Sequence, residues 1–457
     1  MAFVADRRRR ALPGNFEEFE RTLHGRMMEA EREVLAEELA KADIDEESVV
    51  IEGTQCRRVL RCAQTYQTAA GPVEVERTLY KDRRDPLSLS LVPLDARIGI
   101  IEGRWTPLAA KQATWVVSQM TPQLAEELFA RVGNMTPSKS SLDRLPKALS
   151  ARWESDRESF ENTLRDAIEI PEGATTVAVS LDGVMAPMKD TDPVATRERA
   201  AQQGKLPKGP AGYREVGCAT LSFCDADGQM VSAIRMARMP ESKKATLKKS
   251  LLAELMVILK RKPGLRIAKV ADGAEDNWTF LHDEVPEGPE VLDFYHAAEH
   301  LSGALAAAYG DGSVQTQRRF NDLRHVLRHE TQGVEKVISA LLHLRARHPN
   351  KKTIATELAY FRKNRHRMRY AELAAQGIPI GSGMVEAACK TLVAQRLKCS
   401  GMRWGPEGGQ AILTVRGWTQ SERFDQAWAL LAATYELQVT TFDNVIDIRS
   451  ARRRTSG

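Results

Sequence analysis

The pattern of hydrophobic and polar residues predicts a long helix followed by a β-hairpin near the N-terminus. Apolar residues recur at helical spacing after Asn15, a residue type that often caps helices, so we expect a charged helix reaching about Ala42. Two extended runs follow at 57–67 and 73–80, separated by the turn-forming sequence Ala-Ala-Gly-Pro at 69–72. Because the second run alternates apolar and polar residues, we interpret the pair as a β-hairpin.

Two short helices with clear start and stop signals are predicted farther along the chain. Thr121-Pro122 combines a capping residue with proline at the first helical position, and Gly133 ends the segment. Thr136-Pro137 repeats the start signal before the second helix. Two such helices form either a DNA-binding helix-turn-helix or a plain helical hairpin, and the pattern fits both about equally well. In a helix-turn-helix, the residues presented to DNA phosphates and base edges would be Lys139, Ser140, Arg144 and Lys147.

A buried strand is predicted at 175–181, where apolar and β-branched residues dominate and Asp182-Gly183 then breaks the run. A carboxylate at the end of a buried strand is unfavourable unless it has a partner. Catalysis on a bound metal ion is one reason to keep Asp182 there. The alternative is that Asp182 merely caps the next turn, since Asp-Gly is a common turn dipeptide, and this strand taken alone favours that alternative.

The segments after this strand alternate between strand and helix patterns. A loop rich in Lys, Gly, Pro and Gln at 189–212 precedes a hairpin, whose runs at 215–223 and 230–238 flank Asp-Ala-Asp-Gly. Apolar residues on one face then predict a helix at 243–260, and the strand that follows it again ends in an aspartate, Asp272. Strand, hairpin, helix and strand in this order are typical of a ribonuclease-H-like domain, a mixed sheet flanked by helices.

We therefore expect an α/β protein: a mainly helical N-terminal region containing the helix-turn-helix, then a ribonuclease-H-like mixed sheet with a helical insertion. A fifth strand is expected at 289–295, and the helical patterns after His296 are too long for a loop. The expected divisions are a charged helix at 1–50, a β-hairpin region at 51–105, a helix-turn-helix DNA-binding domain at 106–170, the first part of the catalytic domain at 171–300, the helical insertion at 301–377, the second part of the catalytic domain at 378–425, and a C-terminal helix with a basic tail at 426–457.

The overall charge changes this picture little. The 457 residues carry 66 Lys and Arg against 61 Asp and Glu, a net charge of +5, so a signal for nucleic-acid binding must come from clustering. Basic runs occur at 7–10, 362–367 and 452–454. Each run alone is more often a solvated face or tail than a binding site.

The 6 cysteines lack the spacing of a zinc module, which favours reduced thiols in a cytosol. No apolar run approaches the roughly 20 residues that a membrane helix requires, and the arginine-rich start lacks the apolar core of a signal peptide. We therefore expect a cytoplasmic protein, next to the nucleoid if it binds DNA, with no membrane contact.

A third acidic residue, Glu386, lies in the sequence Ile-Gly-Ser-Gly-Met-Val-Glu at 380–386, where Ser382 or its glycine neighbours can start a helix. The Gly-Ser-Gly sequence does not match the nucleophile elbow of serine hydrolases, and no phosphate-binding P-loop sequence occurs. Two aspartates from strand ends and a glutamate from a later helix can hold two divalent ions about 4 Å apart for phosphoryl transfer. Such carboxylate oxygens favour Mg²⁺, whereas zinc prefers His or Cys.

Several short motifs occur in a fixed order between 175 and 418. They are Asp182-Gly183, Asp272-Gly273, Leu-Asp-Phe-Tyr-His at 292–296 with Glu-His-Leu at 299–301, Gly-Ser-Gly-Met-Val-Glu at 381–386, and Arg-Leu-Lys at 396–398 with Gly-Met-Arg-Trp at 401–404. Taken together, these motifs resemble a DDE transposase of bacterial insertion sequences. The chain is similar to the Mutator-like branch, whose members carry an Asp-or-Cys, two residues, His signature before a helical insertion, here Asp293 and His296.

The resemblance implies that Asp182, Asp272 and Glu386 are the catalytic acids and bind two Mg²⁺ or Mn²⁺ ions. Candidate supporting residues are Asp293, His296 and His300. The two histidines would contact the scissile phosphate or stabilise the junction between sheet and insertion. Other acidic residues compete for the metal, and Asp293 is the strongest competitor; the weaker ones are Asp190, Asp192, Glu275 and Asp276.

A basic face follows Glu386 and would follow the DNA backbone. It is formed by Lys390, Arg396, Lys398 and Arg403. A solvated helix face is the alternative. Trp404 would either stack on a DNA base or belong to the core.

The function implied by the resemblance is that of a transposase. It would bind the terminal inverted repeats of its element, cleave double-stranded DNA and join the ends to target DNA, as a homodimer or higher oligomer. Two alternatives stay open. One is a Mg²⁺-dependent DNA nuclease of the same fold, which hydrolyses without joining, and the other is a non-catalytic DNA-binding repressor derived from a transposase.

Overall fold

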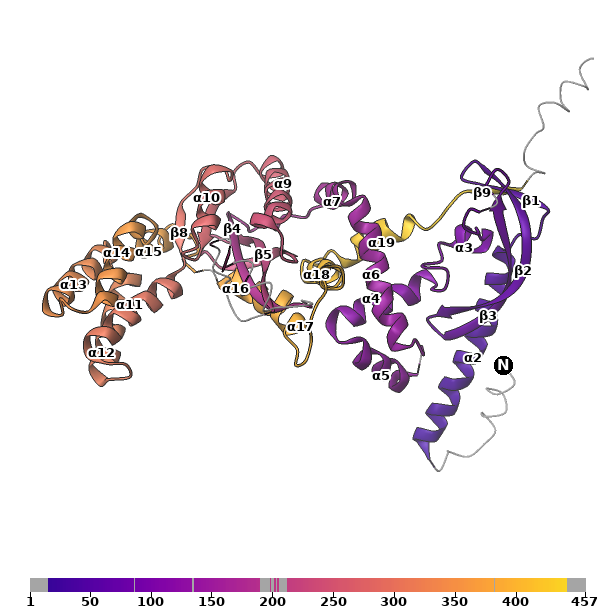
Figure 1. The fold of residues 1–457 in the computed structure, drawn as a ribbon, viewed down its shortest axis with the longest axis horizontal. Coiled ribbons are helices and arrows are strands. Elements are labelled where there is room, and N and C mark those ends of the chain that lie inside the picture. Colours follow the sequence, from indigo (N-terminus) through magenta and orange to yellow (C-terminus); the bar gives the residue numbers. More distant parts are fainter. Residues whose placement is uncertain are drawn as a thin grey trace, which may run out of the picture. The chain divides into compact units, whose positions relative to one another are not determined.

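The computed structural model describes residues 15–85, 87–133, 135–189, 198, 201–202, 204, 212–381 and 383–441. The chain divides into two compact units, one formed by 1–149 with 428–457 and the other by 150–427 (Figure 1). Some sequence predictions fall outside the described residues: the arginine runs at 7–10 and 452–454, most of the loop at 189–212, and Asp190, Asp192 and Ser382.

The first unit begins with α2 (Phe16–Ala42), and its start is capped as the sequence predicted. The Asn15 side chain accepts a hydrogen bond from the Glu18 N–H at 3.2 Å. Near the end of the helix, Leu39 is buried together with Tyr66 of the β-hairpin. Burial of apolar side chains at this end fixes the helix to the sheet.

The predicted hairpin belongs to a four-stranded antiparallel sheet with the strand order β3-β2-β1-β9. The strands are β1 (Ser48–Ile51), β2 (Thr54–Thr68), β3 (Gly71–Asp82) and β9 (Val439–Thr441). β9 comes from the C-terminal part of the chain, and its Thr441 lies opposite Val49. The sequence did not predict β1 or β9, because both are short and their pairing joins distant segments.

The helices of the first unit include the two with clear start and stop signals. Thr121 caps α5 (Pro122–Val132) by accepting the Leu124 N–H at 3.1 Å, and Gly133 ends it with a φ of 84°, a left-handed conformation that favours glycine. The second helix, α6 (Lys139–Ser155), runs well beyond the predicted short segment. The other helices are α3 (Pro93–Ile98), α4 (Pro107–Gln119) and α19 (Phe424–Ala433), which begins in the second unit.

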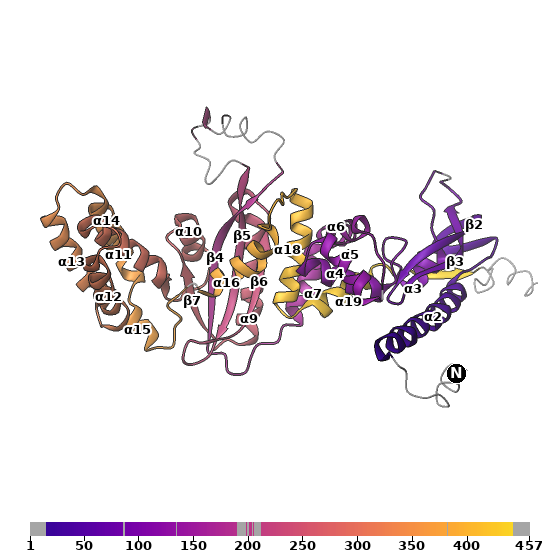
Figure 2. The ribbon, with the colours of Figure 1, turned by 90° about the horizontal axis from the view of Figure 1, so that it is seen from below.

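The second unit is built on a five-stranded mixed sheet with the order β6-β5-β4-β7-β8. Its strands are β4 (Thr176–Pro187), β5 (Tyr213–Cys224), β6 (Met230–Arg238), β7 (Arg266–Ala271) and β8 (Glu290–Leu292). β4, β5 and β6 are antiparallel neighbours, whereas β7 pairs in parallel with both β4 and β8 (Figure 2). Together with its helices, the sheet gives this unit the predicted α/β character.

Two strand boundaries predicted from the sequence are wrong. Asp182-Gly183 does not break the central strand: β4 continues to Pro187, because β5 pairs with it along this whole length. The fifth strand, β8, ends at Leu292, because Asp293 caps the next helix. Asp182 therefore lies within β4, one residue beyond Leu181, the last residue that β7 pairs with.

Two buried apolar clusters hold helices against this sheet. One joins strand residues such as Val179 and Leu221 to Leu251 and Leu255 of the predicted helix α9 (Ala245–Arg261). The other joins Val216 and Cys218 to the segment after 383. The helical elements of this unit outside the insertion are α7 (Arg157–Asp166), η1 (Ser242–Lys244), α9, α10 (Glu275–Asp283), α16 (Gly383–Ala388), the π-helical η3 (Cys389–Ala394), α17 (Gln395–Leu397) and α18 (Pro406–Gln420).

The predicted insertion is helical, as the sequence indicated, and its first helix starts directly after β8 (Figure 1). The elements are α11 (Phe294–Tyr309), α12 (Val314–His329), α13 (Gly333–Arg347), α14 (Lys352–Asn364), η2 (Arg365–Arg367) and α15 (Tyr370–Ala374). Leu301 of α11, Leu327 of α12, Leu341 of α13 and Leu358 of α14 are buried in the same apolar cluster as the sheet. The insertion therefore shares a core with the strands that carry Asp182 and Asp272.

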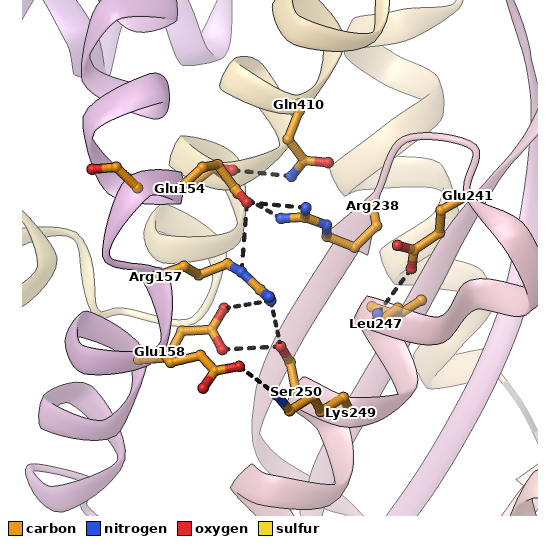
Figure 3. A network of polar contacts seen from close by, with 12 residues as sticks. Glu154, Arg157, Glu158, Arg238, Glu241, Leu247, Lys249, Ser250 and Gln410 are labelled. Carbon is orange, nitrogen blue, oxygen red and sulfur yellow. Dashed lines mark hydrogen bonds and ion pairs between the residues drawn. The ribbon is translucent and has the colours of Figure 1, made fainter.

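A polar network ties α7 and the end of α6 to the outer strand β6 and to α9 (Figure 3). Arg238 donates two hydrogen bonds to Glu154, at 2.5 and 3.1 Å. Arg157 donates to the Ser250 hydroxyl at 3.2 Å, and Lys249 pairs with Glu158. Charge-assisted, bidentate contacts such as that of Arg238 add geometric specificity to the packing at this edge of the sheet.

Among the described residues, we found no helix with the length and apolar character needed to cross a membrane.

Candidate active site

Two of the predicted acids lie next to each other on the central strands. β4 and β7 pair in parallel, and Leu181 lies opposite Ala271 at the last position of the ladder. Asp182 and Asp272 are the next residues of the two strands, and both are partly buried. Because the strands are parallel and in register, the two carboxylates leave the sheet at the same level.

The environment of Asp182 disfavours its ionised form. Burial raises the pKa of the Asp182 carboxyl above its usual value, and the negative charge of Asp272 raises it further. Opposing this, Oδ1 accepts the Gly183 N–H at 2.6 Å and Oδ2 accepts the Cys389 S–H at 3.4 Å. A cation bound between the two aspartates would remove the repulsion that raises this pKa.

Asp272 is held by the helix that follows it. Its Oδ1 accepts the Ala274 N–H at 3.1 Å, and the Trp278 indole donates to the Asp272 carbonyl at 2.6 Å. Asn277 is buried at 1 % exposure and donates from its amide to the Leu181 carbonyl at 3.3 Å. The same amide nitrogen lies 3.5 Å from Asp272 Oδ1, so Asn277 links β4, at the residue before Asp182, to the end of β7. Sequence analysis missed Asn277, since an asparagine in the first turns of a helix carries no special signal.

Glu386, the third predicted acid, lies on α16 with an exposed side chain. Its helix belongs to the layer that covers β4, and Cys389, three positions later, reaches Asp182. A hydrogen bond with Cys218, followed by burial and the charge of Asp182, raises the pKa of the Cys389 thiol, so it stays protonated as the donor. Sequence analysis missed both cysteines, which carry none of the usual spacing signals.

The donor set of this site fits a divalent metal ion in part. Asp182 and Asp272 supply the carboxylate oxygens that a hard cation such as Mg²⁺ prefers, and their mutual repulsion fits a bound positive charge. In the part of the chain that the structure describes, however, no three His, Cys, Asp or Glu side chains come close enough to hold one metal ion. The arrangement thus provides an aspartate pair, and Glu386 does not complete a three-ligand group with it.

Asp293 follows the third parallel strand. Leu292 of β8 lies opposite Ala271 of β7, so Asp293 leaves the sheet beside Asp272. Its side chain is 1 % exposed, and its Oδ1 accepts the His296 N–H at 2.6 Å as the cap of α11. Capping a helix is a complete structural role for one oxygen of this carboxylate. Both oxygens of Asp182 accept hydrogen bonds as well, so the cap alone does not rank Asp293 below Asp182 as a metal ligand.

His296 and His300 form a polar cluster with two residues of α14. The His300 Nδ1 lies 2.6 Å from Glu357 Oε2, and the two histidine Nε2 atoms lie 3.3 Å apart. The Tyr360 ring stacks on His300 with centroids 3.7 Å apart. Burial, and then the charges of Asp272 and Glu357, raise the pKa of the Tyr360 hydroxyl well above its ordinary value. Sequence analysis missed Glu357 and Tyr360, because they occupy ordinary positions of an amphipathic helix.

The predicted basic face after Glu386 is only partly at the surface. Lys390, Lys398 and Arg403 are exposed. Arg396 is 2 % exposed, and its guanidinium lies 5.1 Å from the Trp404 ring centre, so its inclusion in this face was wrong. The indole of Trp404 donates to the Leu397 carbonyl at 2.9 Å and packs against a core cluster, as the core alternative for this residue expected.

The predicted DNA-contacting residues of the first unit share one exposed face of α6. They are Lys139, Ser140, Arg144 and Lys147. Arg144 Nε donates to the Ser140 carbonyl at 3.2 Å, and Lys147 pairs with Asp143. The face is thus basic, with one acidic residue reducing its charge.

No protein-family model matches this chain, and no curated protein matches it either.

Proposed function

We propose that this chain is a DNA transposase that cleaves and joins DNA strands on an acidic site of the DDE type. The observation that carries the proposal is the pair of aspartates, Asp182 and Asp272, at the same level of adjacent parallel strands. Phosphoryl-transfer sites that use two metal ions need carboxylates held together in this way. Burial, and then the charge of Asp272, raise the pKa of the Asp182 carboxyl. A bound cation would stabilise the ionised form of this carboxyl, which supports a metal-dependent reaction.

The strand order supports a ribonuclease-H-like catalytic domain. β4, β5 and β6 form an antiparallel meander, a helix follows, and β7 then returns to pair with β4 in parallel. This topology is the one expected from the order of strand, hairpin, helix and strand in the sequence. β4, the first strand of this sheet, lies in its middle. Its Asp182 is therefore next to Asp272, which directly follows β7.

Each residue of the site has a proposed role in the reaction. Asp182 and Asp272 would hold the divalent ions, and when bound, these ions lower the pKa of the attacking water or 3′-hydroxyl and stabilise the leaving oxygen. Asn277 and the Gly183 N–H orient the two carboxylates. Glu386 is the proposed third acid; because it does not complete a three-ligand group here, this role requires its carboxylate to approach the aspartates when DNA and metal bind.

DNA would be contacted by separate exposed basic residues. On α6, Lys139, Arg144 and Lys147 would meet phosphates and base edges of the terminal repeats. In the catalytic unit, Lys390, Lys398 and Arg403 would follow the backbone near the site of cleavage. Bringing two ends of an element together calls for two or more copies of the chain, so we propose a homodimer or higher oligomer on double-stranded DNA.

The second candidate is a non-catalytic DNA-binding repressor, which the exposed basic face of α6 also supports. A repressor would keep the basic face of α6 and would have no need for Asp182 and Asp272 to face each other.

Metal-dependent cleavage and joining of DNA tests the proposal. The substrate is a labelled duplex carrying the ends of the element, identified from the DNA that flanks the gene, and wild type is compared with Glu386→Ala. Joined products that require both Mg²⁺ and Glu386 support a transposase. Cleavage without joining indicates a nuclease, and specific binding with neither reaction indicates a repressor.

A further inference from the structure

Two arginines of the insertion lie over one aromatic ring beside the candidate site. Arg324 and Arg328 are one turn apart on α12, and their guanidinium carbons lie 5.6 and 5.2 Å from the centre of the Phe294 ring. Both distances are within the range of a cation–π contact. The ring is 1 % exposed, whereas both arginines are partly exposed. The two positive charges are therefore held close together, with part of each side chain open to solvent.

Phe294 fixes this arginine pair close to the predicted acids. It directly follows Asp293, which leaves the sheet beside Asp272. Its N–H donates to the Ile380 carbonyl at 3.1 Å, in the segment that leads to Glu386. Phe294 thus joins the end of β8, the first turn of the insertion and the segment before α16. Phosphates next to one held at the aspartates would lie near this junction.

The arginine pair lacks a counter-charge in the part of the chain that the structure describes. Four other arginines of this unit with largely covered side chains each pair with a carboxylate; they are Arg165, Arg238, Arg367 and Arg423. Among the described residues, Arg324 and Arg328 form neither a hydrogen bond nor an ion pair. Like charges four positions apart on a helix repel each other. An external anion between the two guanidinium groups would remove that repulsion.

We propose that Arg324 and Arg328 bind backbone phosphates of double-stranded DNA next to the site of cleavage. This inference rests on the proposed function, because the aspartate pair would hold the cleaved phosphate and the arginine pair its neighbours. A guanidinium group presents several N–H donors in a fixed plane, which suits phosphate oxygens. The contact with the Phe294 ring restricts both side chains, so less freedom is lost when a phosphate binds. The insertion thereby takes part in binding the substrate.

The test measures the affinity for the labelled end duplex, and for an unrelated duplex of equal length, at several salt concentrations. Arg324→Gln and Arg328→Gln keep much of the side-chain stem and remove the charge. Arg345→Gln, at an exposed position on the last turn of α13, is the matched control. One phosphate contact contributes about 0.9 to the slope of log affinity against log salt concentration. We expect each Gln variant to lower this slope by about 1, the double variant by about 2, and the control to keep the wild-type slope.

Melting temperatures and lysine variants separate DNA binding from a structural role. Each Gln variant should bind both duplexes about tenfold more weakly at low salt, since a phosphate contact carries no sequence information and a charged donor is lost. Arg324→Lys and Arg328→Lys keep the positive charge and should recover most of the slope. A pair that only covers the Phe294 ring would lower the melting temperature of the Gln variants at an unchanged slope, and that result overturns the proposal.

The outcomes distinguish this inference from the proposed function. Wild-type cleavage together with Gln variants of unchanged salt slope overturns the phosphate contact and leaves the transposase intact. Lower slopes in a protein that binds DNA without metal-dependent cleavage support the DNA contact and overturn the transposase, and absence of DNA binding by the wild type overturns both. Inorganic phosphate, added at constant ionic strength, tests for a small anion. If it raises the melting temperature of the wild type but not of the Gln variants, and the slopes are unchanged, the site binds free phosphate and the DNA contact is overturned.

Discussion

Cys389 and Asp182 are joined by a hydrogen bond in which the thiol donates to Oδ2 at 3.4 Å. The contact connects the segment that carries Glu386 to the central strand, across 207 positions of sequence. Because the thiol is buried and its pKa is raised, it stays protonated and unreactive toward oxidation. The Cys389 thiol is therefore a structural hydrogen-bond donor. It partly offsets the cost of burying the ionised Asp182 carboxylate beside Asp272.

Asp182→Asn should stabilise the metal-free protein at neutral pH. The pKa of the Asp182 carboxyl is raised in the folded state from 3.8, so the folded state binds this proton more tightly than the unfolded state. Stability is therefore lost as pH rises from the unfolded pKa through the folded pKa, and the whole penalty is present above the latter. Melting temperatures of both proteins are measured from acidic to neutral pH. The variant should melt at a higher temperature than the wild type only once the pH has risen above this interval. Asp311→Asn, at an exposed position, is the control; an equal advantage there would contradict the prediction.

Mg²⁺ should raise the melting temperature of the wild-type protein through the same pair of aspartates. A ligand present at about 100 times its Kd stabilises the folded state by about 2.7 kcal/mol. We expect Asp182→Asn and Asp272→Asn each to remove most of this shift. Glu386→Ala should keep much of it, since Glu386 does not join the pair in the free protein. A full Mg²⁺ shift in both aspartate variants would show that the ion binds elsewhere.

Local sequence signals predicted the local parts of this fold. The caps at Asn15 and Thr121 and the glycine stop at Gly133 were read correctly, because capping depends on neighbouring backbone groups alone. The continuation of β4 past Asp182 was not predicted, because it depends on the length of its partner strand β5. The pairing of β9 with β1 joins segments far apart in the sequence, and no local pattern carries that information.

The candidate site was predictable only where its residues follow apolar strand patterns. Asp182 and Asp272 follow apolar runs, and parallel pairing of those runs makes them neighbours. Asn277 and Tyr360 carried no signal, since their position at the site depends on how α10 and α14 pack. Arg396 was assigned to a basic face because it lies among other basic residues shortly after Glu386, yet it is buried against Trp404.

Arg144→Ala should weaken binding to the specific DNA end if α6 reads DNA. Loss of a base contact from an arginine costs about 1–3 kcal/mol and relaxes specificity at one position, whereas loss of a phosphate contact weakens binding to all sequences and lowers the salt slope by about 1. Titrations of specific and unrelated duplexes at several salt concentrations distinguish the two roles. Arg131→Ala, on the last turn of α5, is the control. Unchanged affinity of Arg144→Ala at fixed salt would remove α6 from the DNA interface.

Glu254→Ala should strongly destabilise the protein. Glu254 is 4 % exposed and accepts a hydrogen bond from Arg423 at 2.7 Å, with Arg165 Nε 3.5 Å away. Its removal leaves the buried Arg165 and the partly buried Arg423 short of a counter-charge, and breaking a buried pair costs about 3–5 kcal/mol. Because Arg165 keeps its second partner, Glu161, at 2.6 Å, we expect a loss of about 3 kcal/mol, the lower end of that range.

Urea unfolding of Glu254→Ala and of Glu158→Ala measures this difference. Glu158 forms a solvent-exposed pair with Lys249, so its removal should leave the unfolding midpoint nearly unchanged. Glu254→Gln keeps the shape and one acceptor, and its midpoint should fall between wild type and Glu254→Ala. If both Glu254 variants unfold at the wild-type midpoint, the buried charges are solvated or paired differently in solution. The ion network would then not be what fixes α7 and α9 to the sheet.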